Sequence, residues 1–314
     1  MRTFLLVSTA LLFAGVAADA QAPARPSWAF LTPDKDQPPA AEEAGPIRIP
    51  GSAKSYTAKQ IDDLTHPPDW FPGEHGPLPQ VVEGAAGSTA LACGACHLMA
   101  GQGHPESADL AGMPVEYLVR QMADFKNGTR IDPARMNAIA KATSEEDSRK
   151  AAEWFAALKP TVWVKVMETS TVPKSYVSTK GRMRLPLPGG GTEPLGNRII
   201  ELPQDPARAT SRDPHSGFAG YVPVGSIEKG KRLAATGGSG RTISCTICHG
   251  GDLRGLGDVP RLAGLHPIYI ARQLYNFKGS EYSGSSAALM KKVVAKLTDD
   301  DILNLSAYAA SLAP

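Results

Sequence analysis

The sequence contains very little cysteine. Four cysteines occur in 314 residues. All four lie in two copies of one pattern, Cys-x-x-Cys-His, so none is left over for a disulfide or a metal site elsewhere. The two copies are Cys93-Gly94-Ala95-Cys96-His97 and Cys245-Thr246-Ile247-Cys248-His249.

The chain also lacks an excess of charge of one sign and long apolar runs. It has 33 Lys and Arg against 31 Asp and Glu, with no basic run or aromatic-interleaved patch, which argues against nucleic-acid binding. Its longest apolar run, 4–16, is shorter than the roughly 20 residues that a spanning helix needs. Arg2 precedes this run and Ala18-Asp19-Ala20 follows it. The pattern predicts a signal peptide over residues 1–20 and export to the bacterial periplasm, with an uncleaved anchor as the alternative.

The repeated cysteine pattern is typical of covalent attachment of a c-type haem. The two thiols form thioethers with the haem vinyl groups, and the adjacent histidine becomes an axial ligand of the iron. A single Cys-x-x-Cys could instead be a redox dithiol or half of a zinc site. Zinc needs further ligands at finger-like spacing, and none follow. The two motifs therefore predict two covalent haem c groups, with Cys93, Cys96, His97, Cys245, Cys248 and His249 as binding residues.

The distribution of proline predicts the domain organisation. Prolines concentrate in 21–80 and in 161–223, and because proline breaks helices, helical packing is expected around the two motifs. We expect a proline-rich N-terminal arm (21–80), a first haem domain (81–160) and a second haem domain (224–314). A β-containing connector (161–223) should bridge them, with strands at 161–167, 175–178 and 197–202.

Two features of the arm allow a local prediction. Thr57 and Gln60 form a capping box that predicts a short helix. Trp70 and Phe71 follow in an irregular stretch. We expect them to anchor the arm to the body, although packing over a haem edge is an alternative.

The two haem-bearing segments repeat each other. Leu-Ala-Gly follows each motif histidine at the same spacing, and Tyr, Arg-Gln and Phe-Lys then come in register. Pro114 and Gly128 bound a predicted helix, and Ser144 and Thr298 open the last helix of each segment. The matching residues of the two segments are Leu110 and Leu262, Tyr117 and Tyr269, Gln121 and Gln273, and Phe125 and Phe277. Such self-similarity indicates an internal duplication.

On these residues each segment resembles a class I cytochrome c domain, and the pair resembles dihaem cytochromes of the cytochrome c4 type. The resemblance covers the two helical segments and leaves out the arm and the connector. It implies that a late methionine is the sixth iron ligand. Met136 and Met290 take that place, opposite His97 and His249.

Other ligands are possible from the residues alone. Either methionine could be a packing residue, since Met fills core gaps well. Met113 and Met122 are further methionines in the first segment, although packing is expected for them, and Met99 is too close to His97 in the sequence to reach the opposite haem face. His104 and His266 are alternative ligands of the iron.

The resemblance also implies a backbone carbonyl that holds each proximal histidine ring. It belongs to Ala108 in the first segment and to Pro260 in the second. This bond tunes the histidine and therefore the iron. Proline fixes its own φ angle and alanine does not, so the two carbonyls are held differently. We therefore expect the two haems to differ in reduction potential.

These observations predict a mainly α protein with two class I cytochrome c domains. An iron with both His and Met bound has no open coordination site, which favours a periplasmic electron carrier over an enzyme. Its partners would be redox proteins, such as a dehydrogenase or quinol-oxidising donor and an oxidase or reductase acceptor. One alternative is the cytochrome subunit of a periplasmic dehydrogenase, such as a quinoprotein. A dihaem peroxidase or a thiosulfate dehydrogenase is a less favoured alternative. The first needs one haem with a vacant or displaceable distal site, and the second uses an extra cysteine as a ligand, whereas all four cysteines here belong to the two motifs.

Overall fold

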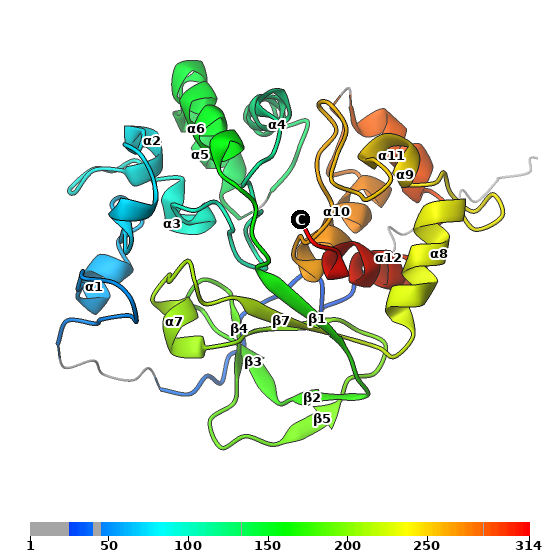
Figure 1. The fold of residues 1–314 in the computed structure, drawn as a ribbon, viewed down its shortest axis with the longest axis horizontal. Coiled ribbons are helices and arrows are strands. Elements are labelled where there is room, and N and C mark those ends of the chain that lie inside the picture. Colours follow the sequence, from blue (N-terminus) through cyan, green and yellow to red (C-terminus); the bar gives the residue numbers. More distant parts are fainter. Residues whose placement is uncertain (1–24, 40–44, 133, 285) are drawn as a thin grey trace, which may run out of the picture.

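The computed structural model describes residues 25–39, 45–132, 134–284 and 286–314. The signal peptide expected at 1–20 lies outside these residues. Two groups of helices lie beside each other, and the strands form a third group next to both (Figure 1). Among the described residues, no helix has the length and apolar character needed to cross a bilayer.

The first helical group surrounds the first motif. Both ends of α4 and the start of α6 lie where the sequence predicts. Pro114 is the N-cap of α4, and Gly128 closes it in the left-handed conformation with φ 75°. The Ser144 side chain caps α6 by accepting from the Asp147 amide at 3.0 Å. The group consists of α2 Gln80–Glu83, α3 Gly94–His97, α4 Val115–Asn127, α5 Met136–Ala142 and α6 Glu145–Ala157.

The second helical group repeats this arrangement around the second motif and adds a longer first helix. Thr298 and Asp301 form the capping box of α12. Helix α8 packs closely on α12 at Gly230, where a Cβ atom would lie 1.9 Å from the Asn304 carbonyl oxygen. Only glycine permits this contact. The helices are α8 Ser226–Thr236, α9 Thr246–His249, α10 Pro267–Lys278, α11 Ala287–Val294 and α12 Asp299–Ser311.

All strands of the described residues lie in the segment between the two helical groups. One sheet has the order β1-β7-β6, with β1 parallel and β6 antiparallel to β7, and β2–β5 and β3–β4 form two antiparallel pairs. Strands β1, β3 and β6 overlap the three stretches expected to be extended. The elements are β1 Val164–Glu168, β2 Thr171–Pro173, β3 Ser175–Val177, β4 Arg184–Pro186, β5 Thr192–Pro194, β6 Ile200–Pro203, α7 Pro206–Thr210 and β7 Phe218–Val222.

This strand segment packs against both helical groups. Val222 is buried against Ile268 of α10 and Leu303 of α12. On the other side, Trp163 and Phe218 are buried with Leu98, the residue that follows the first motif. The sheet is therefore fixed to both haem-motif regions through apolar contacts.

The arm lies along the body of the protein. Helix α1 Ala58–Ile61 has the expected capping box between Thr57 and Gln60. The Trp70 ring is buried, and its Nε1 donates to the Ser211 carbonyl at 2.7 Å. Phe71, next to the short 3-10 helix Pro72–Glu74, packs on the His215 ring with centroids 4.2 Å apart. Both aromatic residues anchor the arm, as expected.

Candidate haem sites

The first motif forms one helical turn, α3. The His97 amide donates to the Cys93 carbonyl at 3.0 Å, which brings Cys93, Cys96 and His97 onto one short turn. The His97 Nδ1 bonds to the Ala108 carbonyl at 2.8 Å. With Nδ1 as the donor, the lone pair of Nε2 is available to a metal. This geometry fits a proximal iron ligand.

The second motif has the same helical turn and the same histidine hydrogen bond as the first. In α9 the His249 amide donates to the Cys245 carbonyl at 3.0 Å, and the His249 Nδ1 bonds to the Pro260 carbonyl at 2.9 Å. Both carbonyls expected from the resemblance therefore hold their histidine. The bond is the same length within 0.1 Å at the two sites, although one carbonyl belongs to alanine and the other to proline.

Burial sets the protonation of the motif residues. It lowers the pKa of His97 and of His249, and the carbonyl bonds oppose this only in part, so both rings are neutral at pH 7. Burial raises the pKa of the Cys93 thiol to about 12 and that of Cys245 to about 11. Neutral imidazole suits iron, whereas such thiols are poor metal-binding thiolates. Among the described residues, no group of three His, Cys, Asp or Glu is arranged to hold a metal ion.

Each candidate methionine ligand lies in the short helix that follows the long helix of its group, α5 after α4 and α11 after α10. Met136 is the first residue of α5, and its amide donates to the Asp132 carboxylate at 2.8 Å. Met290 lies within α11 and is half-buried. By contrast, Met99 and Met113 are buried in the hydrophobic core, and the Met99 sulfur lies against Gly94.

The alternative histidine ligands are engaged elsewhere. The Glu106 amide donates to the His104 Nδ1 at 3.3 Å, and the His104 Nε2 bonds to the Ser107 hydroxyl at 3.2 Å. His266 is fully buried, and its Nδ1 bonds to the Glu201 carboxylate of β6. These contacts use both ring nitrogens of His104 and the Nδ1 of His266.

One buried cation gave no signal in the sequence. Arg130 is buried where the two helical groups meet, and its backbone bridges to Tyr282 of the other group. Its guanidinium bonds to the Gln121 side chain at 2.6 Å and to the Gln273 side chain at 3.1 Å. It also lies 4.3 Å from the Phe125 ring centroid. No carboxylate among the described residues is within ion-pair distance of it. A buried charge paired only with neutral groups fits an anion supplied from outside the chain.

The two motifs differ sharply in what covers them. Ala95, inside the first motif, is 1% exposed, and Arg212 donates to its carbonyl. Ile247, at the matching position of the second motif, is 65% exposed. Ile243 and Leu289, which lie near Ile247 and Met290 in the sequence, are exposed apolar residues as well. The loop between the two cysteines is therefore covered by protein in the first motif and open to solvent in the second.

Comparison with known proteins supports a haem protein. No protein-family model matches the chain. Cytochrome c4 of Stutzerimonas stutzeri is 27% identical over 239 residues, which cover 74% of this chain and 89% of that protein. Cytochrome c-554(547) of Halothiobacillus neapolitanus is 36% identical over 90 residues, which cover 25% of this chain and 99% of that protein.

A solved structure supports the fold. The thiosulfate dehydrogenase (TsdBA) of Marichromatium purpuratum matches 74% of this chain and 39% of its own, with a TM-score of 0.51 and 24% identity. The chain belongs to the c-type cytochromes. Its two motifs and its match to cytochrome c4 over most of both chains make it a dihaem, cytochrome c4-like electron-transfer protein with two covalently bound haem c groups.

Proposed function

We propose that this protein is a periplasmic carrier that exchanges single electrons with partner proteins through the open edge of its second haem. The observation that carries the proposal is the contrast between Ala95, which is buried, and Ile247, which is exposed. When bound, each haem supplies a one-electron iron couple. Electron transfer slows steeply with distance, so the open edge is the favourable contact for a protein partner.

The axial ligands in this proposal are His97 with Met136, and His249 with Met290. Support comes from the neutral histidines with their carbonyl bonds and from the use of Met99 and Met113 in the core. Iron with both positions filled carries electrons and binds no substrate. The haem domains would occupy 81–160 and 224–314, with 161–223 as the connector.

Arg130 would neutralise a haem propionate. Its guanidinium is buried between the two helical groups, and its bonds go to the neutral side chains of Gln121 and Gln273 and to the Tyr269 hydroxyl. A propionate in this place would supply the missing negative charge. Burial of both groups would make the pair stronger than a surface ion pair.

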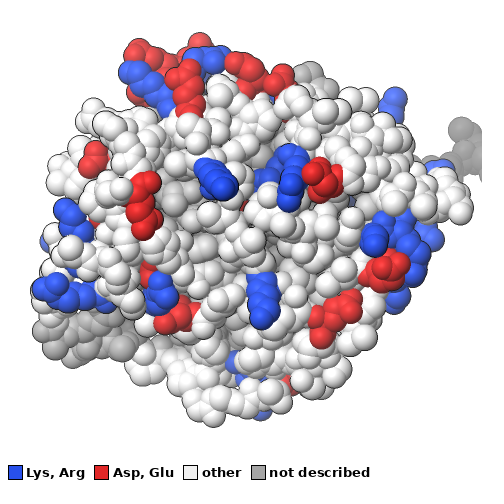
Figure 2. Space-filling model, in the orientation of Figure 1, with Lys and Arg blue, Asp and Glu red and all other residues white. Residues whose placement is uncertain are grey.

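The surface around the second motif fits a partner with an apolar contact patch. Ile243, Ile247 and Leu289 are exposed apolar residues near the motif and the candidate methionine. Figure 2 shows Lys and Arg interspersed with Asp and Glu on the face that it draws, so charge of one sign does not dominate there. A redox protein with an apolar patch around its own cofactor would meet these residues. Such a partner could be a mobile protein or the catalytic subunit of a periplasmic dehydrogenase.

The ligand assignment is tested by the EPR spectrum of the ferric protein and by cyanide binding. Two low-spin haems that bind cyanide slowly are expected. A Met290→Ala variant should then show a high-spin signal and rapid cyanide binding at one haem, because it opens one coordination position. An unchanged spectrum in this variant would contradict the ligand role of Met290.

The docking face is tested by stopped-flow oxidation of the ferrous protein with a monohaem class I cytochrome c. Ile247→Glu should lower the second-order rate constant about fivefold or more, because it places a charge at the contact. Val162→Glu is the matched control, since Val162 is also an exposed apolar residue but lies in the connector. Equal effects of the two substitutions would contradict a docking face at the second haem.

A further inference from the structure

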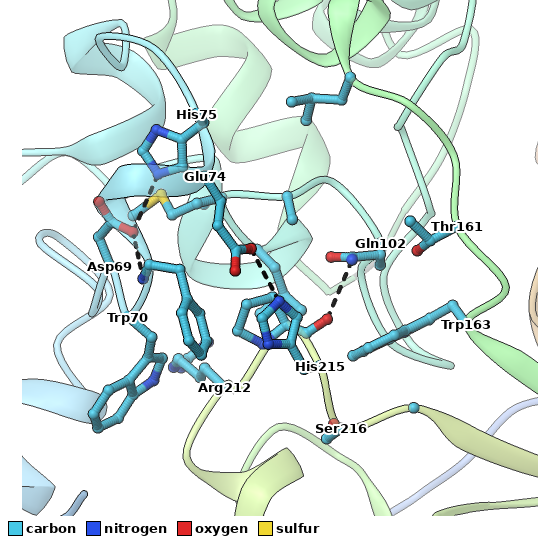
Figure 3. Close-up of a pocket in the computed structure, with 18 of the residues that line it drawn as sticks. Asp69, Trp70, Glu74, His75, Gln102, Thr161, Trp163, Arg212, His215 and Ser216 are labelled. Atoms are coloured by element: carbon cyan, nitrogen blue, oxygen red, sulfur yellow. Dashed lines mark hydrogen bonds and ion pairs between the residues drawn. The ribbon is translucent and has the colours of Figure 1, made fainter. Parts of the chain in front are cut away.

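A cavity of about 500 Å³ lies beside the first motif, on the side where the arm and the connector meet (Figure 3). Gly94, Leu98 and Met99 of the motif region form part of its lining. Trp70 and Phe71 of the arm and Trp163 of the connector complete it. Its volume is within the range of small-molecule sites.

Two polar side chains that line this cavity have unused hydrogen-bonding atoms. Gln102 and Ser216 are each 6% exposed. Gln102 Oε1 and Ser216 Oγ have no hydrogen-bond partner within the parts of the chain that the structure describes. The Gln102 Nε2 donates to the Pro214 carbonyl at 3.2 Å, which fixes the amide so that the oxygen remains as an acceptor. Buried polar atoms without partners are costly, so a bound donor would stabilise this arrangement.

Aromatic rings form much of the wall. Trp163 is buried, and its Nε1 donates to the Gly103 carbonyl at 3.3 Å. The Nε1 of Trp70 is likewise bonded, to Ser211. Phe71 and His215 pack on each other. Because the indole N–H groups are already used, the rings are held in place and offer apolar faces rather than donors.

The charges around the cavity mostly come in pairs. His75 lies 3.2 Å from the Asp69 carboxylate, and His215 lies 3.0 Å from that of Glu74 (Figure 3). Three cations of the lining have no such partner, since no described carboxylate forms an ion pair with Lys159, Lys165 or Arg212. The two lysines are exposed, and the Arg212 Nε donates to the Ile61 carbonyl at 2.8 Å. Cations beside an aromatic wall favour an electron-rich aromatic ring as the ligand.

We propose that this cavity binds a small, electron-rich aromatic molecule with hydroxyl groups, of the phenol or hydroquinone class. Its hydroxyl would donate to Gln102 Oε1, a second polar contact would go to Ser216, and the ring would pack against Trp163. The proposal does not depend on the assignment of the methionine ligands or on the docking face.

The test uses the holoprotein in its fully reduced state, so that no electron transfer accompanies binding. Isothermal titration calorimetry compares hydroquinone with 1,4-dimethoxybenzene, which has the same ring but no hydroxyl donors. Hydroquinone should bind at least about tenfold more tightly, the effect expected for one hydrogen bond to a buried acceptor. Equal affinities, or no binding of hydroquinone, would overturn the proposal.

Variants locate the site. Gln102→Met keeps the side-chain length but removes the acceptor, and should weaken hydroquinone binding about tenfold. Gln80→Met is the matched control, since Gln80 is exposed in α2 and does not line the cavity. Ser216→Ala removes a hydroxyl without adding volume and serves if Gln102→Met fails to fold. Wild-type affinity in both cavity variants would show that hydroquinone binds elsewhere and would overturn the assignment.

Discussion

His104 should make the stability of this protein depend on pH. Burial lowers its pKa to about 3, and the positive charges of Arg212 and Arg272 act in the same direction. Its Nδ1 accepts a hydrogen bond from the Glu106 amide, which a protonated ring cannot do. The folded protein therefore holds this imidazole in its neutral form.

The magnitude follows from linkage. The unfolded chain takes up a proton on His104 below its ordinary pKa of 6.5, whereas the folded protein does so only near 3. Because the unfolded state binds the extra proton, this group destabilises the fold as pH decreases through that window. Between pH 8 and pH 5 it should lower the free energy of unfolding by about 2 kcal/mol. Urea unfolding of the ferric holoprotein at several pH values, followed by far-UV circular dichroism, measures this change.

A His104→Gln variant isolates the effect, because its side-chain oxygen can still accept from the Glu106 amide. We expect its stability to vary by about 2 kcal/mol less than that of the wild type between pH 8 and pH 5. His66→Gln is the control, since His66 is exposed. Parallel pH profiles for the wild type and His104→Gln would refute the reasoning.

Further predictions concern the contact between helices and the buried arginine. Gly230→Ala should lower the free energy of unfolding by at least about 3 kcal/mol in urea titrations, because its Cβ would lie 1.9 Å from the Asn304 carbonyl oxygen. A loss below about 1 kcal/mol would mean that α8 can move away from α12 at little cost and would contradict the tight contact. Arg130→Gln should lower the reduction potential of at least one haem by some tens of millivolts in a spectroelectrochemical titration, because it removes a positive charge that favours the ferrous form. Unchanged potentials would place Arg130 away from both haems.

The sequence predicts the local structure around the motifs well, because short-range interactions determine it. The capping boxes at Thr57 and Thr298 and the glycine cap at Gly128 depend on residues only a few positions apart. Helix α8 was not predicted. Its amphipathic pattern, with Ile227 and Leu233 among charged residues, could have revealed it, since Leu233 is buried in the core.

Long-range features could not be predicted. The parallel pairing of β1 with β7 joins residues more than fifty positions apart, with no short turn to signal it. Arg130 follows a glycine-capped helix end, a position where the sequence alone suggests a surface residue. It is buried because Gln273 and Tyr282 of the other segment contact it. The cavity beside the first motif likewise requires residues from the arm, the motif loop and the connector.

The surroundings of the haems, rather than their histidines, should separate the two reduction potentials. The carbonyl bonds expected to distinguish the sites are nearly equal, at 2.8 Å for His97 and 2.9 Å for His249. The loops between the cysteines differ much more, since Ala95 is covered and Ile247 is exposed, whereas the His249 ring itself is the more buried of the two histidines. The ferric haem carries one more positive charge than the ferrous haem, and burial disfavours that extra charge. The first haem should therefore have the higher potential, so that an electron received at the open second haem moves inward. A redox titration should resolve two steps, and Ile247→Glu should lower mainly the lower-potential one; a single unresolved step would contradict this order.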